Sequence, residues 1–246
     1  MCTIIVAWQW RKDAPLVLAA NRDESLTRPS DPPALLREKP PLWGGRDRLA
    51  GGTWLAVDPR GRVCAVTNRH PGGRAPERDP SRGSRGDIPT LVLSASANDR
   101  AAISAMNGFQ PWQFNPVNAL YLSAAAAFWI GLDDKTGYRA MSLAPGIHVL
   151  TEQDPDDTAS AKTTGLLHAA LNAAQSANDA RALVDGFRVL LQSHDQMGGG
   201  PESAACIHQE RFGTVSSATV VVDRQGVVFE HAEGHPCVTP FLPVLG

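Results

Sequence analysis

Hydrophobic and polar residues along the chain follow two spacings, which predict blocks of hairpins and helices. Short β-branched runs separated by turn residues are typical of strands, and apolar residues three and four positions apart are typical of helices. Residues 2–10 and 16–20 are two such short runs on either side of the polar turn 11–15. They predict a hairpin at the beginning of the sequence.

The same pattern continues along the chain, with turn residues marking where strands reverse. Pro59-Arg60-Gly61-Arg62 separates two apolar runs and predicts a second hairpin. The strands that we expect are 53–58, 63–68, 119–124, 127–132, 138–143, 147–151, 217–222 and 227–231. The helices that we expect are 87–107, 162–174 and 179–192.

Stretches rich in proline or glycine separate these blocks. Five prolines between residues 29 and 41 exclude a central strand, so we predict a loop there, and the glycine- and arginine-rich stretch 69–86 is a second predicted loop. Hairpins at both ends, with helices between strand blocks, predict a layered α+β domain with mostly antiparallel sheets. Because no internal repeat or low-complexity linker interrupts the 246 residues, we expect one domain over residues 1–246.

Composition and charge exclude several classes of protein. Hydrophobic residues make up 43% of the chain and charged residues 20%, which are ordinary values for a globular protein. No run of about 18 apolar residues is present, so we expect no transmembrane segment. A formal net charge of −2 and a pI near 6.4 argue against a nucleic-acid-binding protein. Residues 60–85 carry seven arginines and either face an anionic ligand or form a solvated charged surface.

The cysteines show no metal-binding spacing. Cys2, Cys64, Cys206 and Cys237 include no C-x-x-C pair, so we expect no metal site. Cys206-Ile207-His208 is either a soft-metal or haem contact or, as we prefer, a half-buried structural pair. Free thiols, together with an N-terminus that lacks a signal-peptide pattern, are typical of a protein of the reducing cytoplasm.

Residue 2 carries the most informative chemistry in the sequence. Methionine aminopeptidases remove Met1 when the next residue is small, as Cys2 is, and the mature chain then begins with that cysteine. Its α-amine has an ordinary pKa of about 7.7–8.0 and acts as the base for its own thiol, whose ordinary pKa is about 8.5. A thiol and a free amine on one residue are the chemistry of an N-terminal nucleophile.

Asp23 and Arg22 are the predicted partners of this cysteine. The return strand of the first hairpin brings residues in the low twenties back beside residue 2. There we expect Asp23 to hold the α-ammonium group and Arg22 to lower the pKa of the thiol. The alternative is a polar loop with surface ion pairs, which usually contribute less than about 1 kcal/mol each.

Short motifs follow one another in a fixed order along nearly the whole chain. They are Met1-Cys2-Thr3, Asn21-Arg22-Asp23-Glu24, Trp43-Gly44-Gly45-Arg46-Asp47, Leu49-Ala50-Gly51-Gly52-Thr53-Trp54, Ala65-Val66-Thr67-Asn68, Ser84-Arg85-Gly86 and Gly213-Thr214-Val215-Ser216-Ser217. Together they resemble the NRDE family, also called the transport and Golgi organisation protein 2 family. That resemblance implies a four-layer αββα sandwich of the N-terminal nucleophile (Ntn) hydrolase type. Eukaryotic members of the family are associated with haem mobilisation and with lipid or acyl-CoA metabolism.

A more distant similarity is to the choloylglycine hydrolases and penicillin V acylases, which cleave amide bonds with an N-terminal cysteine. By this resemblance Cys2 is the nucleophile and Asp23 orients its amine. Asn68 stands where that group keeps an oxyanion-hole asparagine. The catalytic residues that the resemblance implies are therefore Cys2, Arg22, Asp23 and Asn68.

Three positions depart from the pattern of these families. Arg22 directly precedes the aspartate instead of standing two residues before it, and Val215 stands where the NRDE family usually has arginine. Glu152 takes the place of a second oxyanion-hole asparagine, with Gln153 beside it as a substitute donor. Losing one oxyanion donor typically costs a factor of about 10² to 10³ in rate.

Two functions from different classes follow. The first is a hydrolase that acts on a non-peptide amide or related acyl bond of a small molecule and requires no cofactor. The alternative is a non-enzymatic protein that handles haem or binds an acyl-CoA-like lipid, in which His70 meets the haem iron and Arg69 or Arg74 meets the propionates. In both cases the expected partner is a small molecule, anionic or lipid-like.

Overall fold

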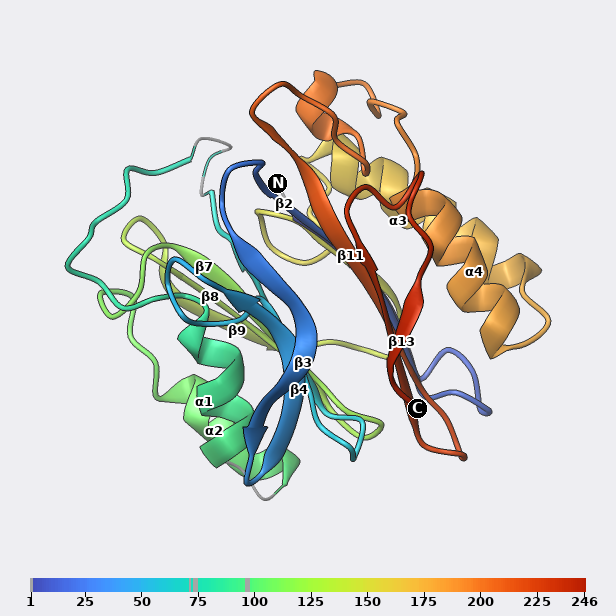
Figure 1. Cartoon of the computed structure of the whole chain (residues 1–246), viewed down its shortest axis with the longest axis horizontal. Helices are drawn as coiled ribbons and strands as arrows, with labels where there is room; N and C mark the ends of the chain where they lie inside the picture. The colour runs from blue at the N-terminus through green and yellow to red at the C-terminus, as the bar shows by residue number, and fades with distance from the viewer. Residues whose placement is uncertain (1, 71, 73–74, 96–97) are drawn as a thin grey trace. The chain divides into compact units, whose positions relative to one another are not determined.

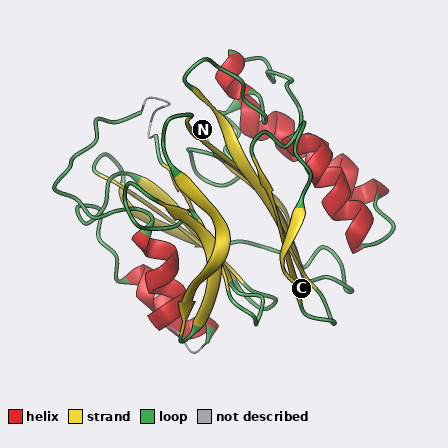
Figure 2. Cartoon of the chain, in the orientation of Figure 1, coloured by secondary structure: helices red, strands yellow, loops and turns green. Residues whose placement is uncertain are grey.

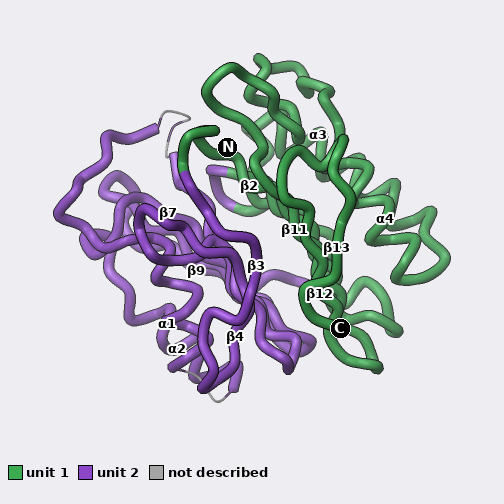
Figure 3. The backbone as a smooth tube through the Cα atoms, in the orientation of Figure 1, with its two compact units in different colours: residues 1–28, 145–151, 155–246 green, residues 29–144, 152–154 purple. Residues whose placement is uncertain are grey.

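The computed structural model describes residues 2–70, 72, 75–95 and 98–246 (Figure 1). The chain divides into two compact units, each described by itself below (Figure 3). Unit 1 contains residues 1–28, 145–151 and 155–246, and unit 2 contains residues 29–144 and 152–154. The expectation of a single domain over residues 1–246 stays a prediction, because a division into compact units does not test it. In the described residues, no helix is both long and apolar enough to cross a membrane.

Unit 1 is built on a six-stranded antiparallel sheet of order β10-β1-β2-β11-β12-β13. The hairpins expected at the two ends of the sequence are both present, and they lie side by side because β2 pairs with β11. Strand β11 begins five residues earlier than expected, and β13 was not predicted. The strands are β1 (Thr3–Trp8), β2 (Leu16–Ser25), β10 (Gly146–Leu150), β11 (Phe212–Val222), β12 (Val227–Glu233) and β13 (Leu242–Leu245).

Two helices pack against the unit 1 sheet, and both were predicted within two residues of their ends. They are α3 (Ala161–Ser176) and α4 (Ala180–Leu191), and a short 3-10 turn follows at Pro201–Ser203. Ser160 and Asp179 cap the two helices, because each side chain accepts a hydrogen bond from the backbone N–H three residues further on. The apolar faces of the helices and sheet form one core, which includes Ile5, Val17, Val149, Leu166, Leu183 and Phe187.

Unit 2 is built on a seven-stranded antiparallel sheet in which the strands follow chain order from β3 to β9. The predicted central hairpin and the predicted strands that follow are confirmed. The strands are β3 (Ser30–Glu38), β4 (Pro41–Asp47), β5 (Leu55–Val57), β6 (Val63–Asn68), β7 (Val117–Leu122), β8 (Ala127–Asp133) and β9 (Gly137–Ser142).

The helix predicted over 87–107 is wrong as one element, because it is two helices. They are α1 (Asp87–Ala95) and α2 (Asp99–Asn107), while residues 96–97 lie outside the described part of the chain. Asn98 has an extended backbone, and its side chain accepts a 2.9 Å hydrogen bond from the backbone N–H of Ala101. A capping asparagine of this kind begins a new helix.

The prediction of a loop over the proline-rich stretch 29–41 is also wrong, since most of it is strand β3. Pro32 and Pro33 lie where the pairing of β3 with β4 shifts, between Asp31 and Ala34. Strand β3 is at the edge of the sheet, where a residue without a backbone N–H is tolerated. The prediction that this proline-rich stretch does not form a central strand is therefore confirmed.

Each unit thus combines an antiparallel sheet with a pair of helices that packs against it (Figure 2). The α+β class and the mostly antiparallel sheets predicted from the sequence are confirmed. In unit 2, the helices cover a core that includes Ile88, Val92, Met106, Tyr121 and Ile130.

Candidate active site

The first two strands bring Cys2 beside Asp23 in unit 1. Thr3 pairs with Asn21 in the antiparallel register of β1 and β2, so the chain immediately before Thr3 runs alongside Arg22 and Asp23. The Cys2 thiol lies 3.7 Å from the backbone carbonyl oxygen of Asp23 and donates to it. The hairpin therefore produces the proximity expected between residue 2 and the low twenties.

Thr214, on the neighbouring strand β11, fixes the carboxylate of Asp23. Asp23 is 5% exposed, and its Oδ1 accepts a 2.6 Å hydrogen bond from the Thr214 hydroxyl. The same hydroxyl accepts a 2.9 Å hydrogen bond from the backbone N–H of Ile207. The Thr214 hydroxyl thus acts both as a donor and as an acceptor. The side chain of Asp23 is therefore oriented by a buried hydrogen-bond network rather than by solvent. Thr214 belongs to the motif at residues 213–217, but the sequence alone indicates no role for it.

A β-bulge at Val215 sets this geometry. Asp23 pairs with Thr214 and Arg22 pairs with Ser216, so Val215 has no residue opposite it on β2. The carbonyl of Val215 accepts a 2.9 Å hydrogen bond from Gly234 instead. A bulge turns the strand and changes the direction of the neighbouring side chains, and such irregularities are common beside active sites. The position at which the family usually has arginine is thus the extra residue of the bulge.

Opposing effects act on the pKa of the Cys2 thiol. Burial raises the pKa of Cys2, and the Asp23 carboxylate raises it further. The backbone hydrogen bond to Asp23 and the Arg22 guanidinium lower this pKa, but the net shift is upward. Arg22 is itself only 6% exposed. The thiol is therefore protonated near neutral pH, and its activation requires a base.

Asn21, the first residue of the Asn-Arg-Asp-Glu motif, has a structural position. Its side-chain amide donates to the carbonyl oxygens of Leu191 (2.9 Å) and Ala205 (2.8 Å), and its Oδ1 accepts a hydrogen bond from Ser217. All of these groups are buried. Asn21 therefore ties β2 to the end of α4 and to the segment before β11, which explains an asparagine at this position without a catalytic role.

Asn68 belongs to the other unit. It is the last residue of β6 and pairs with Val117 of β7. Its side chain is exposed. Unit 1 therefore brings Cys2, Arg22 and Asp23 together, and unit 2 presents Asn68 at a strand end.

The residues at the second expected oxyanion position also lie in unit 2. The backbone carbonyl of Glu152 accepts a 2.8 Å hydrogen bond from His70, and the Gln153 amide donates a 2.5 Å hydrogen bond to the His70 carbonyl. Among the described residues, Oε2 of Glu152 is buried without a hydrogen-bond partner. One donor of Gln153 is thus already used within the unit, and Glu152 presents a carboxylate at the position where the resemblance implied an amide.

The residues expected to contact haem have different surroundings. Arg69 is 2% exposed and its guanidinium forms ion pairs with Asp133 (2.6 Å) and Asp154 (2.8 Å), so it does not present a free charge to a propionate. His70 is partly exposed, and burial lowers its pKa while Glu152 raises it. Arg74 lies outside the described residues.

The chain also shares its fold with solved hydrolases. An N-acylethanolamine-hydrolysing acid amidase ortholog from Caenorhabditis elegans is similar over 89% of this chain and 92% of its own, with 16% identity and a TM-score of 0.58. Two variants of conjugated bile acid hydrolase from Clostridium perfringens are similar over 100% of this chain and 97% of their own, with 8% identity and TM-scores of 0.51 and 0.56. The protein therefore has the α+β fold of the Ntn hydrolases, as the resemblance implied.

Sequence comparison then gives the family. A family profile described as Transport and Golgi organisation 2 matches residues 1–233, and the chain belongs to this family. The mouse Transport and Golgi organization 2 homolog is 35% identical over 83 residues, which are 32% of this chain and 29% of the mouse protein. The human homolog is 34% identical over 93 residues, which are 34% of this chain and 30% of the human protein. The matched segments thus span about 30% of the length of these relatives.

Proposed function

We propose that this protein is an Ntn hydrolase that cleaves a non-peptide amide or a related acyl bond, with Cys2 as the nucleophile after removal of Met1. The observation that carries the proposal is the position of the Cys2 thiol against Asp23, whose carboxylate Thr214 orients. The fold shared with an acid amidase and a bile acid hydrolase supports the class of reaction. The reducing cytoplasm, where the thiol stays unoxidised, is the proposed compartment.

In the proposed reaction the α-amine of Cys2 takes the thiol proton as the sulfur attacks the acyl carbon. Burial and Asp23 raise the pKa of the thiol in the chain that carries Met1, so the sulfur requires a base such as this amine to lose its proton. A C–S bond forms and the carbonyl becomes an oxyanion, for which Asn68 is the proposed donor. The C–N bond then breaks, the amine leaves with the proton, and water hydrolyses the acyl-enzyme to release the acid and restore the thiol.

Asp23 and Arg22 have separate parts in this proposal. Asp23 holds the α-ammonium group when it has taken the proton, and the hydrogen bond from Thr214 keeps the carboxylate in one orientation. Arg22 lowers the pKa of Cys2 through its charge and so offsets part of the effect of burial. The proposed substrate is a small molecule, anionic or lipid-like.

The test begins with intact-mass spectrometry of the untagged protein, which determines whether Met1 has been removed. A panel of N-acyl amides and acyl thioesters is then offered to the wild type, Cys2→Ala and Cys64→Ala. Cys64 is fully buried in the unit 2 core and serves as the matched control. We expect turnover in the wild type and in Cys64→Ala and none in Cys2→Ala. Retention of Met1, or full activity in Cys2→Ala, would refute the proposal.

Glu152 favours a second function, that of a carrier for haem or an acyl-CoA-like lipid. A carboxylate at the expected second oxyanion position opposes the charge that develops in amide hydrolysis, and it does not oppose simple binding. Titration of the protein with haem and with acyl-CoA distinguishes the two functions. Saturable binding without turnover, unchanged in Cys2→Ala, supports the carrier. Absence of a shift in the haem Soret band at micromolar protein contradicts its haem form.

A further inference from the structure

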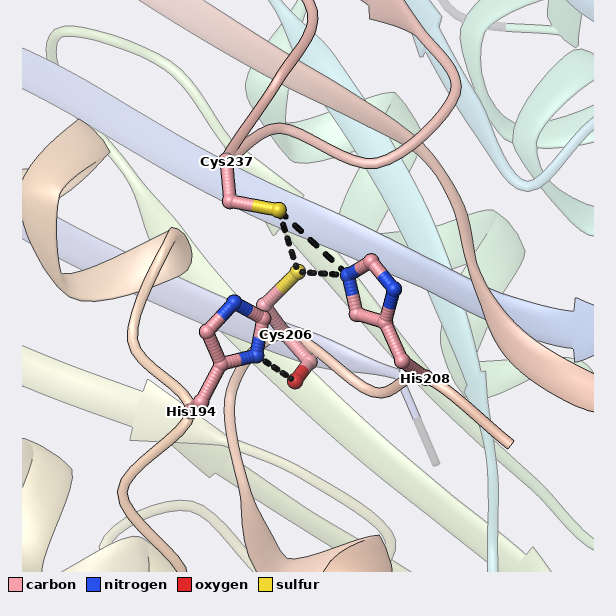
Figure 4. Close-up of side chains that lie close together, drawn as sticks. All are labelled: His194, Cys206, His208 and Cys237. Atoms are coloured by element: carbon pink, nitrogen blue, oxygen red, sulfur yellow. Dashed lines mark hydrogen bonds between the residues drawn. The ribbon is translucent and has the colours of Figure 1, made fainter.

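Four side chains from three separate segments of unit 1 come together in a cluster of two cysteines and two histidines (Figure 4). His194 follows α4, Cys206 and His208 lie in the segment before β11, and Cys237 follows β12. One potential ligand atom from each residue lies within 4.8 Å of the other three. Cys206 is buried, Cys237 is half-buried and the two histidines are exposed, so the cluster is reachable from solvent.

The spacing of these atoms fits a tetrahedral metal site. The Cys206 and Cys237 sulfurs are 3.8 Å apart, and Nε2 of His208 lies 3.5 Å from the first and 3.3 Å from the second. Zinc holds sulfur at about 2.3 Å and nitrogen at about 2.0–2.1 Å, which in a tetrahedron separates two sulfurs by about 3.8 Å and sulfur from nitrogen by about 3.6 Å. Three ligands thus already have the separations that one zinc ion requires.

A hydrogen bond to the backbone orients His194 as the fourth ligand. Its Nδ1 lies 3.1 Å from the carbonyl oxygen of Cys206, so Nδ1 carries the proton and Nε2 keeps its lone pair. A hydrogen bond from the second ring nitrogen to a backbone carbonyl is the usual partner of a metal-bound histidine. In Figure 4 the other nitrogen of the His194 ring lies on the side of the Cys206 sulfur. Because His194 is exposed, its ring has room to close on the ion.

Further contacts hold the ligands in place. The ring of His208 stacks on His235 with centroids 3.8 Å apart, and it meets the edge of His194 at 4.9 Å. The backbone N–H of Cys206 donates a 2.8 Å hydrogen bond to Ser193, which connects the two segments beside their ligands. These contacts orient two of the ligands before any ion binds.

We propose that a Zn²⁺ site with two cysteine and two histidine ligands is formed by His194, Cys206, His208 and Cys237. Two thiolates and two imidazoles suit this borderline-soft ion, and four protein ligands leave no open position, which is typical of a structural site. Binding replaces the two thiol protons, which are released to solvent. The ion would join the end of α4, the segment before β11 and the segment after β12. Ile207, between two of the ligands, donates to the Thr214 hydroxyl that holds Asp23.

The experiment uses the full chain, purified under reducing conditions and stripped of metal by a chelator. It is titrated with Co²⁺, whose ligand-field spectrum reports tetrahedral thiolate coordination, and with Zn²⁺ against a chromogenic chelator. We expect one equivalent of either ion per chain and a higher melting temperature with zinc. Cys237→Ser and His194→Ala should each weaken binding by at least about tenfold. Cys64→Ala, which changes a buried cysteine outside the cluster, should bind as the wild type does.

Two results would overturn the site. One is a wild-type protein that binds no more metal than Cys237→Ser, and the other is a disulfide between Cys206 and Cys237 in freshly purified protein. His194 is exposed, so His194→Ala tests the site even if a cysteine variant does not fold. Since metal content is measured without any substrate, failure of the hydrolase proposal leaves this result unaffected.

Discussion

The hydroxyl of Thr214 lies 2.6 Å from Oδ1 of Asp23, and the two residues are 191 positions apart in the sequence. The contact joins β2 to β11 at the point where the bulge at Val215 interrupts their pairing. Thr214 also accepts a hydrogen bond from the backbone N–H of Ile207, which lies between two of the proposed zinc ligands. One hydroxyl, which contacts both β2 and the segment before β11, thus helps to orient the carboxylate beside Cys2.

Thr214→Val tests this dependence because it keeps the shape of the side chain and removes the hydroxyl. The Ile207 N–H loses its acceptor and Asp23 loses the hydrogen bond from Thr214, and a buried donor that is left unsatisfied costs about 1–3 kcal/mol. We expect a lower free energy of unfolding by urea and slower modification of Cys2 by substrate-like electrophiles. Thr158→Val, at an exposed position, is the control and should change neither measurement. Equal stability of the two variants would contradict the role of Thr214.

The pH dependence of Cys2 alkylation tests the electrostatics of the thiol. Burial and the Asp23 carboxylate raise the pKa of Cys2 in the chain that retains Met1, so in that form its reaction with iodoacetamide should reach half its maximal rate above the ordinary thiol pKa of about 8.5. Asp23→Asn removes one of the two raising effects and should move this midpoint to lower pH. Peptide-resolved mass spectrometry measures the rate at Cys2 alone. A midpoint that does not move, or that moves upward, contradicts the assignment.

The buried ion pair of Arg69 and Asp133 should stabilise unit 2. Their side chains are 3% and 0% exposed and 2.6 Å apart, and removing one partner of such a pair typically costs about 3–5 kcal/mol. Arg69→Met should therefore lower the urea midpoint strongly. Arg139→Met removes an ion pair whose arginine is 48% exposed, and it should cost less than about 1 kcal/mol.

This stabilisation should depend on pH in a defined direction. Burial raises the pKa of Asp133, but hydrogen bonds from Thr136 and Arg69 outweigh it and hold the pKa below its usual range. A carboxyl whose folded-state pKa is lowered stabilises the fold above its unfolded pKa of about 3.9, and this stability is lost as pH falls through the folded value. The difference between wild type and Arg69→Met should therefore be greatest near neutral pH and shrink below about pH 4. A difference that grows on acidification would be evidence against the pair.

Close contacts between backbone segments explain two of the family's glycine motifs. A Cβ on Gly52 would lie 2.4 Å from the backbone of Gly86, and one on Gly86 would lie 3.0 Å from the nitrogen of Thr53. The Thr53 N–H donates a 2.9 Å hydrogen bond to Gly86 across this contact. Gly52→Ala should therefore lower the melting temperature clearly, and Gly86→Ala should lower it less. The reverse order, or no effect of Gly52→Ala, would show that the backbones separate easily.

Local signals in the sequence predicted much of the fold. The turns at 59–62 and 223–226 are short and rich in turn residues, and both hairpins around them are present. The proximity of Cys2 and Asp23 was predictable for the same reason, since one hairpin creates it. Strand β3 was missed because an edge strand tolerates prolines that a central strand excludes. The break between α1 and α2 was missed because the apolar spacing continues across the capping Asn98.

Contacts between distant segments were not predictable in this way. Thr214 contacts Asp23 only because β11 pairs with β2, which no local pattern reveals, although the motif around Thr214 was visible. The proposed zinc ligands lie on three segments, and their spacing in sequence matches no common metal motif. The short spacing of Cys206 and His208 favours a structural pair, and nothing local in the sequence groups His194 or Cys237 with them.

The order of strands in unit 1 has a consequence for the time at which the protein matures. Strand β1 lies between β2 and β10, and β2 lies against β11, so β2 lacks its second neighbour until the ribosome has made residues up to 222. At about 5–20 residues per second, about 10–40 s separate the synthesis of β2 from that of β11. During this interval the segment around Cys2 is outside any finished sheet and within reach of a processing enzyme. The proposed removal of Met1 therefore has about 10–40 s in which to precede closure of the sheet.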